Sequence, residues 1–426
     1  MFAERTKWNL TPNRLSEALA RHRAAGKPLL DLTASNPTEC GFTYDQNAIL
    51  DALRNPEALK YAPAPRGLES ARQAVSAYHA EHGASVGVED IILTTSTSEA
   101  YSYVFRLLCN PGDEILIPAP SYPLFDFLAD IQDVKLVRYP LVYDHGWQID
   151  FHSLEQAITP RTRAIIVVHP NNPTGNFTKR AEMEKLSVLC TARGLALIAD
   201  EVFLDFSLGP PGSPDSLEND ATNVHSERSE TFLGGISRKK LLATRRSPLA
   251  ASISSFAGNQ AALTFTMSGL SKICGLPQMK AAWLVVAGPD DLKKEALARL
   301  EVIADTYLSM NAPVQLAMPA LISQRRGFQQ QLMARAHRNL EELGCQLAAQ
   351  RVCSRLEIEG GWYAVLCVPA TRSDEDLALS LLDELGVYVH PGHFYDFPSD
   401  GHVVVSLITP PEEFSPGLRR LLMQFH

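Results

Sequence analysis

The chain has 426 residues, of which 45% are hydrophobic and 20% charged, and its formal net charge is −9. These values are typical of a globular protein with about two or three domains, and an acidic chain without a concentrated basic arm is not expected to bind a polyanion. No stretch approaches the roughly 18–20 apolar residues of a membrane span, and residues 1–10 lack the apolar core of a secretory signal. The seven cysteines form no Cys-x-x-Cys pair, so we expect reduced thiols in a cytoplasmic protein.

From residue 91 to residue 287, short apolar runs alternate with stretches of helical periodicity. This alternation is typical of a mostly parallel β-sheet with helices on both faces. We predict strands at 91–95, 114–118, 164–168, 195–199 and 261–267, and helices at 98–109 and 179–193. Gly194 stands where a glycine commonly ends a helix.

The chain changes character after about residue 289. Predicted helices at 291–309 and 313–342 are followed by short predicted strands near 361–368, 387–389 and 403–408, which indicates a second, smaller α+β domain. Segment 209–255 interrupts the earlier alternation, because it is rich in Pro, Ser, Asn and Gly and is longer than most loops of compact domains. We predict a surface insertion that is largely disordered, and we favour this over a regulatory or partner-binding role.

One lysine, Lys272, lies in a loop of small residues directly after the predicted strand 261–267. Burial at the end of a strand disfavours the ammonium form and lowers the pKa, and a neutral amine can condense with a carbonyl group. The small neighbours leave room for a flat cofactor or substrate to reach the nitrogen. The alternative is an ordinary solvated turn lysine.

Two polar side chains follow the preceding predicted strands. Asn172 lies in a Pro- and Gly-containing loop after strand 164–168, and Asp200 follows strand 195–199. Open α/β sheets bind ligands at the carboxyl ends of their strands. An aspartate there can hold a proton on a heteroaromatic nitrogen, whereas the alternatives are a turn-forming asparagine and a surface acid.

Three short motifs therefore occur in a fixed order: Asn172-Pro-Thr-Gly, Asp200-Glu-Val, and Ser271-Lys272 followed by Gly275-Leu-Pro. In this combination the chain resembles the class I and II aminotransferases, which are pyridoxal-phosphate enzymes of fold type I. The resemblance runs from about residue 31 to the last residues, apart from the insertion. It implies an α/β fold with a large domain at 46–289, built on a mostly parallel sheet of the seven-stranded type, and a small domain formed by 1–45 and 290–426.

The resemblance also implies roles for these residues. Lys272 matches the lysine that forms a Schiff base with pyridoxal 5′-phosphate and afterwards carries a proton. Asp200 matches the carboxylate that keeps the pyridine nitrogen protonated, so that the ring accepts electrons. Asn172 matches the hydrogen-bond partner of the ring's phenolic oxygen.

The remaining cofactor contacts follow from the same resemblance. Ser96 and Glu99 have the spacing of a capping box after a strand, and the N-terminus of a helix is a ready anion site, although an ordinary helix cap has the same pattern. The expected phosphate contacts are Ser96, Thr97, Ser98, Ser271 and Lys280.

Two tyrosines complete the expected site. Tyr122 matches the aromatic residue that stacks on the cofactor ring, and the alternative is a packed loop tyrosine. Tyr61 matches a tyrosine that reaches the neighbouring subunit's phosphate, which implies a homodimer.

The sequence departs from the family pattern at three positions. Phe203 stands where a tyrosine usually donates to the phenolic oxygen, so the absorbance of the bound cofactor is expected to titrate at a higher pH than is usual in the family. Lys280 replaces an arginine and gives up its two-pronged contact with phosphate. Val404 occupies the position of the arginine that binds the substrate's α-carboxylate, so either another cation, for example Arg66, binds this group or the substrate lacks it.

The expected function is an aminotransferase that moves an amino group between an amino acid and a 2-oxo acid through Lys272. The alternatives on the same fold are a C–S lyase acting by β-elimination and a decarboxylase. A non-catalytic regulator is disfavoured, because the chain leaves no room for an added DNA-binding domain. The pairs His79/His82 and His390/His393 lack further ligands nearby, so we interpret them as structural and expect no metal site.

Overall fold

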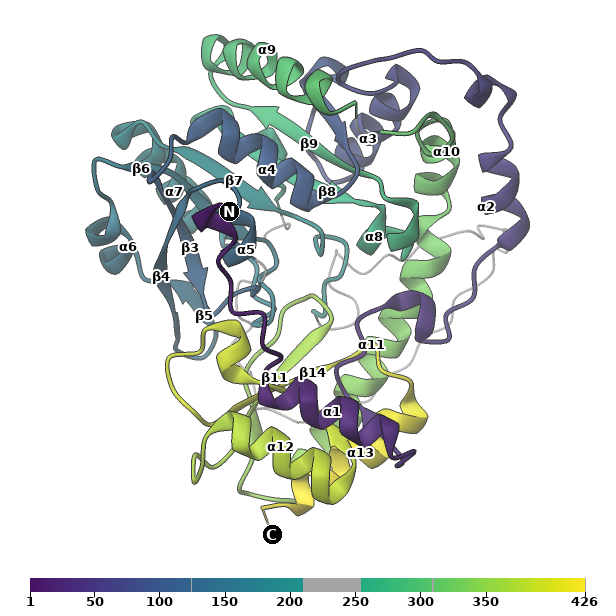
Figure 1. The fold of residues 1–426 in the computed structure, drawn as a ribbon, viewed down its shortest axis with the longest axis vertical. Coiled ribbons are helices and arrows are strands. Elements are labelled where there is room, and N and C mark those ends of the chain that lie inside the picture. Colours follow the sequence, from purple (N-terminus) through teal and green to yellow (C-terminus); the bar gives the residue numbers. More distant parts are fainter. Residues whose placement is uncertain (124, 210–253, 309, 426) are drawn as a thin grey trace, which may run out of the picture. The chain divides into compact units, whose positions relative to one another are not determined.

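The computed structural model describes residues 1–123, 125–209, 254–308 and 310–425 (Figure 1). The segments Met1–Leu208 and Ser254–His426 form one compact unit. Most of the predicted insertion, residues 210–253, lies outside the described residues, so that prediction is not tested. In the part of the chain that the structure describes, no helix is long and apolar enough to cross a membrane. All seven cysteines are free thiols.

An eight-stranded sheet forms the centre of the larger part of the fold (Figure 1). Its strand order is β2-β9-β8-β7-β6-β3-β4-β5, and the four pairs from β8 to β4 are parallel. β9 runs antiparallel to both of its neighbours, and the short β5 adds an antiparallel hairpin to β4. The strands are β2 (Ile91–Thr94), β3 (Glu114–Ala119), β4 (Lys135–Tyr143), β5 (Trp147–Ile149), β6 (Thr162–Val168), β7 (Ala196–Asp200), β8 (Thr264–Gly269) and β9 (Ala282–Ala287).

The predicted α/β fold with a mostly parallel sheet is therefore confirmed, with one strand more than expected. The added strand is β5, which is too short to have a clear alternating pattern in the sequence. Strands β6, β7, β8 and β9 are buried almost along their whole length, because helices cover both faces. The helices of this part are α2 (Gln46–Leu53), α3 (Glu69–Glu81), α4 (Thr97–Leu108), α5 (Phe125–Asp130), α6 (Phe151–Ala157), α7 (Arg180–Arg193), α8 (Leu270–Ile273), α9 (Asp290–Tyr307) and α10 (Ala312–Ser323).

A second, smaller sheet has the order β10-β11-β14-β13, and all of its pairs are antiparallel. Strand β1 pairs in parallel with β12, so a segment from the N-terminal part of the chain lies in the region formed by the C-terminal part. The strands are β1 (Leu30–Asp31), β10 (Ser354–Arg355), β11 (Tyr363–Cys367), β12 (Val387–Tyr388), β13 (His390–Pro391) and β14 (His402–Ser406), and the helices are α1 (Arg14–Ala24), α11 (Arg325–Ala348), α12 (Asp374–Leu385) and α13 (Pro411–Met423). The contribution of the N-terminal residues agrees with the predicted small domain, whose boundaries stay a prediction.

The helix predicted at 313–342 is wrong as a single element. The chain forms two helices there, α10 and α11, which meet at Gln324. The apolar periodicity continues across the break, so the sequence pattern alone did not reveal it. α7 ends as predicted, because Gly194 takes the left-handed conformation with φ 65°.

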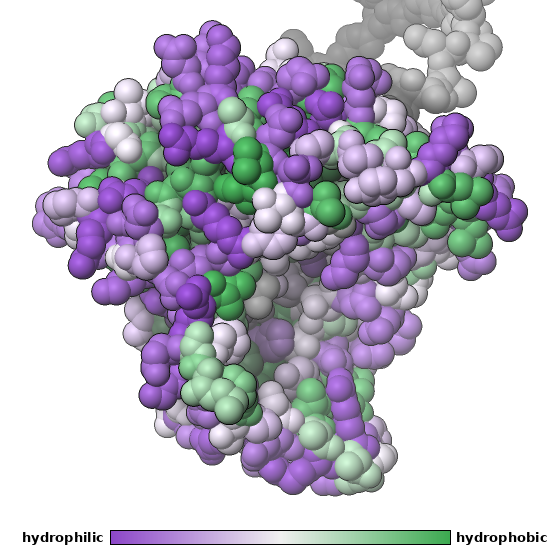
Figure 2. Space-filling model, turned by 45° about the horizontal axis from the view of Figure 1, so that its top comes forward, coloured by the Kyte–Doolittle hydropathy of each residue, from purple (hydrophilic) through white to green (hydrophobic). Residues whose placement is uncertain are grey.

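The surface is mostly hydrophilic on the face shown in Figure 2, where apolar residues occur singly or in small groups among charged and polar ones. Short 3₁₀ turns connect many of the elements, and they are η1 (Glu4–Thr6), η2 (Pro37–Glu39), η3 (Pro56–Leu59), η4 (Val88–Asp90), η5 (Phe256–Gly258), η6 (Pro277–Met279) and η7 (Gly392–Tyr395).

Candidate active site

The carboxyl ends of the parallel strands bring the predicted site residues to one edge of the large sheet. Asp200 is the last residue of β7, Asn172 follows β6, and Lys272 follows β8. β6, β7 and β8 are consecutive and parallel in the sheet, so their carboxyl ends lie next to one another. The structure thus brings the three residues of the strongest sequence motifs together.

The Lys272 side chain lies on the short helix α8, among aromatic rings. Its Nζ is 4.7 Å from the centre of the Trp362 ring and 5.5 Å from the centre of the Phe203 ring. Burial against these rings lowers the pKa of Lys272 to about 8, and the negative charge of Asp200 opposes this change. A much larger fraction of neutral amine is therefore present near neutral pH than for an ordinary lysine.

Asp200 is buried, and both of its carboxylate oxygens accept a hydrogen bond. The backbone N–H of Val202 donates to Oδ1 at 3.2 Å, and the Tyr101 hydroxyl donates to Oδ2 at 3.1 Å. Burial raises the pKa of Asp200 to about 6, while these two donors and the Lys272 charge act in the opposite direction. An acid with such a pKa can share a proton with a weakly basic ring nitrogen.

Asn172 lies in the loop after β6 with an unused polar atom. Its Oδ1 is buried and has no hydrogen-bond partner among the described residues. The oxygen and nitrogen of an amide side chain are assigned from their partners, so this free end serves equally as donor or acceptor. The neighbouring Asn171 fixes the loop instead, because its Nδ2 donates to the carbonyl oxygen of Pro120 and to the Thr174 hydroxyl.

The N-terminus of α4 lies after β2, whose carboxyl end is at the same edge of the sheet. The Ser96 hydroxyl accepts from the backbone N–H of Glu99 at 3.1 Å and so caps the helix as predicted. The second half of the predicted capping box differs, because the Glu99 carboxylate accepts from the N–H of Thr95 and not from that of Ser96. Thr97 and Ser98 open the helix, where backbone N–H groups point outward and favour an anion.

The other predicted cofactor residues surround this edge less closely. Ser271 is half-buried beside Lys272 on α8, and Lys280 is exposed at the end of η6 with a left-handed φ of 52°. The Tyr122 ring is 42% exposed and packs edge-on against Phe125. Tyr61 is 82% exposed.

Phe203 is buried in an aromatic cluster below the lysine. Its ring meets the Trp362 ring edge-on at 5.2 Å, and Trp362 in turn meets Phe206 at 5.3 Å. The Trp362 and Phe203 rings therefore shield the Lys272 amine from water. The sequence motifs pointed to Phe203 as a departure from a pattern and did not predict its packing.

Several residues near the site were missed by sequence analysis. Tyr101, Trp362 and Tyr363 have no motif around them, although Tyr101 lies one helical turn after the Thr97-Ser98 pair and could have been placed by helical spacing. Burial and the nearby Tyr122 raise the pKa of Tyr363, whereas its hydrogen bond with Ser35 acts in the opposite direction. Tyr363 therefore lies on the same side of the site as Tyr122. The backbone N–H of Ser121 donates to the carbonyl oxygen of Tyr395, which joins the smaller sheet region to the Tyr122 loop.

The structure also places the two residues discussed for carboxylate binding. Val404 is buried in the middle of β14, between Val365 and His390 of the neighbouring strands. Arg66 is held elsewhere, because its Nε and Nη2 bind Glu301 at 2.8 and 2.7 Å. The suggestion that Arg66 replaces the missing arginine therefore gains no support.

The described residues contain no group of three or more metal-ligating side chains. Of the two histidine pairs, His79 is fully buried and accepts from the Trp283 indole N–H at 3.1 Å, whereas His393 is exposed. His82 binds Asp205 at 2.7 Å. His390 contacts the Tyr395 hydroxyl at 2.9 Å, and burial lowers its pKa to about 4.

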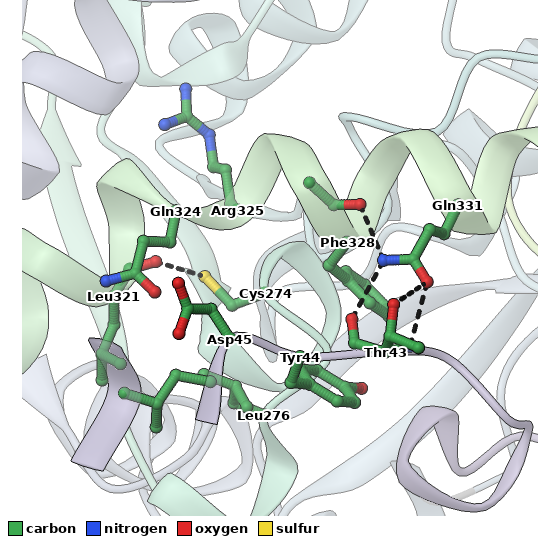
Figure 3. Close-up of a pocket in the computed structure, with 12 residues that line it drawn as sticks. Thr43, Tyr44, Asp45, Cys274, Leu276, Leu321, Gln324, Arg325, Phe328 and Gln331 are labelled. Atoms are coloured by element: carbon green, nitrogen blue, oxygen red, sulfur yellow. Dashed lines mark hydrogen bonds between the residues drawn. The ribbon is translucent and has the colours of Figure 1, made fainter. Parts of the chain in front are cut away.

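A pocket of about 440 Å³ lies on the outer side of the lysine loop (Figure 3). Cys274 and Leu276 of that loop form one wall, and Phe328 of α11 forms another. Gly275 has a φ of 63°, and a Cβ added there would come within 2.4 Å of the Phe328 ring, so only glycine allows this contact. In Figure 3 the Arg325 guanidinium points away from the other lining side chains, toward Glu81, which it binds.

Comparison with known proteins decides the family. The model of the family "Aminotransferase class I and II" matches residues 27–413. The chain belongs to the class I and II aminotransferases. Among curated relatives of this chain, glutamate-pyruvate aminotransferase AlaA of Escherichia coli (strain K12) is 30% identical over 295 residues, which are 69% of this chain and 63% of the relative. Alanine aminotransferase of Mycobacterium tuberculosis is 27% identical and is matched over 94% of this chain and 86% of its own length.

Solved structures show the same fold as this chain. Alanine aminotransferase from Pyrococcus furiosus superposes with a TM-score of 0.82 at 20% identity, covering 100% of both chains. An aminotransferase from Escherichia coli gives a TM-score of 0.78 at 24% identity, covering 99% of this chain and 97% of the other. The fold type inferred from the motifs is therefore confirmed.

Proposed function

We propose that the protein is an aminotransferase that uses pyridoxal 5′-phosphate to move an amino group between an amino acid and a 2-oxo acid. The observation that carries this proposal is the arrangement of Lys272, Asp200 and Asn172 at the ends of three adjacent strands. An amine of lowered pKa, a buried acid and a free amide end are the groups that the aldehyde, the ring nitrogen and the phenolic oxygen of this cofactor require.

The fit can be tested on single atoms of the chain. The buried Oδ1 end of Asn172 lacks a partner, and the hydrogen bonds of Asp200 leave room for a further donor, since a carboxylate accepts about four. The N-terminus of α4 offers the Thr97 and Ser98 backbone N–H groups to a phosphate, and Ser271 and Lys280 are proposed to complete the cradle. The residues present therefore fit the cofactor.

Each residue of the site then has one task. The bound cofactor supplies an electron sink for the bond that breaks at the substrate's Cα. Lys272 carries the proton to and from that carbon, because its amine is partly neutral near pH 8. Asp200 would hold a proton on the ring nitrogen, Asn172 would form a hydrogen bond with the phenolic oxygen, and Tyr122 is proposed to stack on the ring.

The names of the relatives support transfer of an amino group over the alternatives. Both AlaA and the mycobacterial protein are named as aminotransferases of alanine or of glutamate and pyruvate. The C–S lyase and decarboxylase alternatives have no such support. Alanine and glutamate with their 2-oxo acids are accordingly the first substrate pairs to examine.

The test uses purified full-length protein incubated with pyridoxal 5′-phosphate. Borohydride reduction followed by peptide mass spectrometry should locate the cofactor on Lys272, and Lys272→Ala should abolish the label. Added amino acids should convert the bound cofactor to its amine form with release of the 2-oxo acid. Release of ammonia in stoichiometric amounts with the 2-oxo acid would instead support elimination, and a label on another side chain would refute the assignment.

We also propose that the active form is a homodimer in which Tyr61 reaches the partner's phosphate. Residues 60–65 are mostly exposed and border a pocket of about 240 Å³ together with Leu308, Met310 and Asn311. Light scattering after size-exclusion chromatography should give twice the monomer mass. Tyr61→Phe should weaken cofactor binding without changing that mass, whereas an active monomer would contradict the proposal.

A further inference from the structure

The hydrogen bond between Tyr101 and Asp200 links two parts of the site that no sequence motif connects. Tyr101 is buried on α4, and its hydroxyl donates to Asp200 Oδ2 at 3.1 Å. Burial and the nearby carboxylate raise the pKa of Tyr101 well above its ordinary value, so the phenol keeps its proton and acts as the donor. The bond therefore has a fixed direction over the whole physiological range of pH.

We propose that Tyr101 is a positioning residue that holds the Asp200 carboxylate ionised and aimed at the cofactor's ring nitrogen. The proposal rests on the proposed function, because it assumes that pyridoxal 5′-phosphate binds at this edge of the sheet. The backbone N–H of Val202, just after β7, donates to Oδ1, whereas the Tyr101 hydroxyl donates to Oδ2 from the separate helix α4. With both oxygens held, the carboxylate cannot rotate freely about its Cβ–Cγ bond.

The same helix also carries the proposed phosphate contacts. Thr97 and Ser98 open α4, and Tyr101 follows after one turn, which is about 5 Å along the helix axis. α4 thereby sets the separation between the phosphate end and the ring-nitrogen end of the bound cofactor. A rigid helix can keep this separation more constant than two independent loops could.

Packing fixes the position of the Tyr101 ring before any ligand binds. Its ring meets the Phe125 ring edge-on at 5.4 Å with an interplanar angle of 81°, and Phe125 meets Tyr122 at 6.2 Å and 88°. Phe105, one turn further along α4, lies 5.9 Å from Tyr101. The rings of Tyr101, Phe125 and Tyr122 thus form a continuous row, which connects the hydrogen-bond donor of Asp200 with the residue proposed to stack on the cofactor.

A tyrosine elsewhere in the sheet provides the contrast. Tyr139 is equally buried on β4, but its hydroxyl donates to the backbone carbonyl oxygen of Ile166 at 2.7 Å. The acceptor of that hydrogen bond is a main-chain carbonyl and not an ionisable side chain. Tyr139→Phe therefore removes one buried tyrosine hydroxyl without changing the hydrogen bond to Asp200.

The experiment compares Tyr101→Phe with Tyr139→Phe in two measurements. In cofactor-free protein with ¹³C-labelled aspartate, and with Asp200→Asn used for assignment, the pKa of Asp200 should rise above its present value of about 6 in Tyr101→Phe only. The dissociation constant of pyridoxal 5′-phosphate, measured by equilibrium dialysis, should rise by roughly tenfold or more, as expected for loss of a hydrogen bond to a charged group. Tyr139→Phe should leave both quantities unchanged.

Three results would overturn the proposal: an unchanged pKa of Asp200, an unchanged dissociation constant in Tyr101→Phe, or equal changes in both variants. If wild-type protein binds no pyridoxal 5′-phosphate, the proposed function fails and the proposal fails with it, even if the pKa of Asp200 still responds to Tyr101. A double-mutant cycle for thermal stability guards against misfolding of a single variant. In an Asp200→Asn background, Tyr101→Phe should lower the melting temperature less than it does in wild type, and an equal loss would count against the coupling.

Discussion

The Lys272 amine lies 4.7 Å from the centre of the fully buried Trp362 ring, although the two residues are 90 positions apart in the chain. Lys272 follows strand β8 of the large sheet, and Trp362 directly precedes strand β11 of the smaller sheet. The environment of the reactive amine is thus made jointly by both sheets. A cation over an aromatic face is attracted to it, but exclusion of water by the same ring favours the neutral amine. Burial lowers the pKa of Lys272 to about 8, and the negative charge of Asp200 opposes this change.

Trp362→Leu tests this balance. The smaller side chain admits water to Lys272, so the pKa of the amine should rise from about 8 towards its ordinary value of 10.5. Reductive methylation with ¹³C-formaldehyde, followed by NMR titration, reports this pKa without any cofactor. Phe206→Leu is the control, because Phe206 packs on Trp362, whereas the rings over which the Lys272 amine lies are those of Trp362 and Phe203. A pKa that stays near 8 in Trp362→Leu would show that the ring does not control the amine.

Phe203→Tyr restores the hydroxyl that the family pattern leads one to expect. The centre of the buried Phe203 ring lies 5.5 Å from the Lys272 amine, so a hydroxyl on this ring would add a hydrogen-bond donor close to the site proposed for the cofactor. Stabilising the ionised oxygen should lower the pH at which the absorbance of the bound cofactor titrates. The measurement is a spectral pH titration of the two reconstituted proteins. Identical titration curves would refute the interpretation of Phe203 as a functional departure.

Hydrogen bonds from two directions hold the loop that carries Lys272. Gln329 of α11 is buried, and its Nε2 donates to the carbonyl oxygen of Ile273 at 3.0 Å, while the Tyr44 hydroxyl donates to that of Gly275 at 2.8 Å. Gln329→Leu leaves a buried carbonyl without its side-chain donor and should lower the free energy of unfolding by about 1–3 kcal/mol.

Tyr44→Phe should have a smaller effect on stability than Gln329→Leu, because the Tyr44 side chain lies in the wall of the pocket in Figure 3 and water can replace its hydroxyl. It should lower the free energy of unfolding by about 0.5–1.5 kcal/mol. Urea denaturation of the cofactor-free proteins gives both values. Equal and negligible losses would mean that neither bond restrains the lysine loop.

The sequence predicted the parts of the site that depend on strand ends. Asn172, Asp200 and Lys272 each follow an apolar run, and the parallel arrangement of such runs forces their ends to one edge. The residues that surround Lys272 and Asp200 and influence their pKa values come from elements whose positions depend on tertiary packing. Trp362 directly precedes strand β11 of the smaller sheet, and no local pattern specifies which strand of the other sheet it faces.

The features that depend on helical spacing could be predicted from the sequence only in part. The cap at Ser96 could be predicted from four residues of sequence, and the structure confirms that its hydroxyl binds the Glu99 N–H. The same four residues did not predict that the Glu99 carboxylate accepts from the N–H of Thr95 instead of that of Ser96. The break between α10 and α11 at Gln324 was missed, because the apolar spacing continues across it and the nearby Pro319 and Gly327 lie inside the two helices.

Glu201→Gln should change how the stability of the protein depends on pH. Glu201 is fully buried next to Asp200, its carboxylate accepts from the Ser255 hydroxyl and the Phe256 N–H, and burial raises its pKa from 4.5 to about 7. The unfolded chain binds this proton only below about pH 4.5, whereas the folded chain binds it up to about pH 7. Between these values the folded state therefore holds more protons, and stability falls as the pH rises through this window.

Above pH 7 the full destabilisation by the buried charge is present, and it amounts to at most about 3 kcal/mol. Glu201→Gln cannot ionise and keeps an acceptor for the Phe256 N–H, so its stability should vary less between pH 4.5 and pH 7 than that of wild type. Thermal unfolding at pH 5 and pH 8 should show the larger gain for the variant at pH 8. Glu182→Gln is the matched control, since Glu182 is also buried and accepts from the backbone N–H groups of Ile149 and Lys179. If wild type and Glu201→Gln lose stability in parallel over this range, the proton is not held by Glu201.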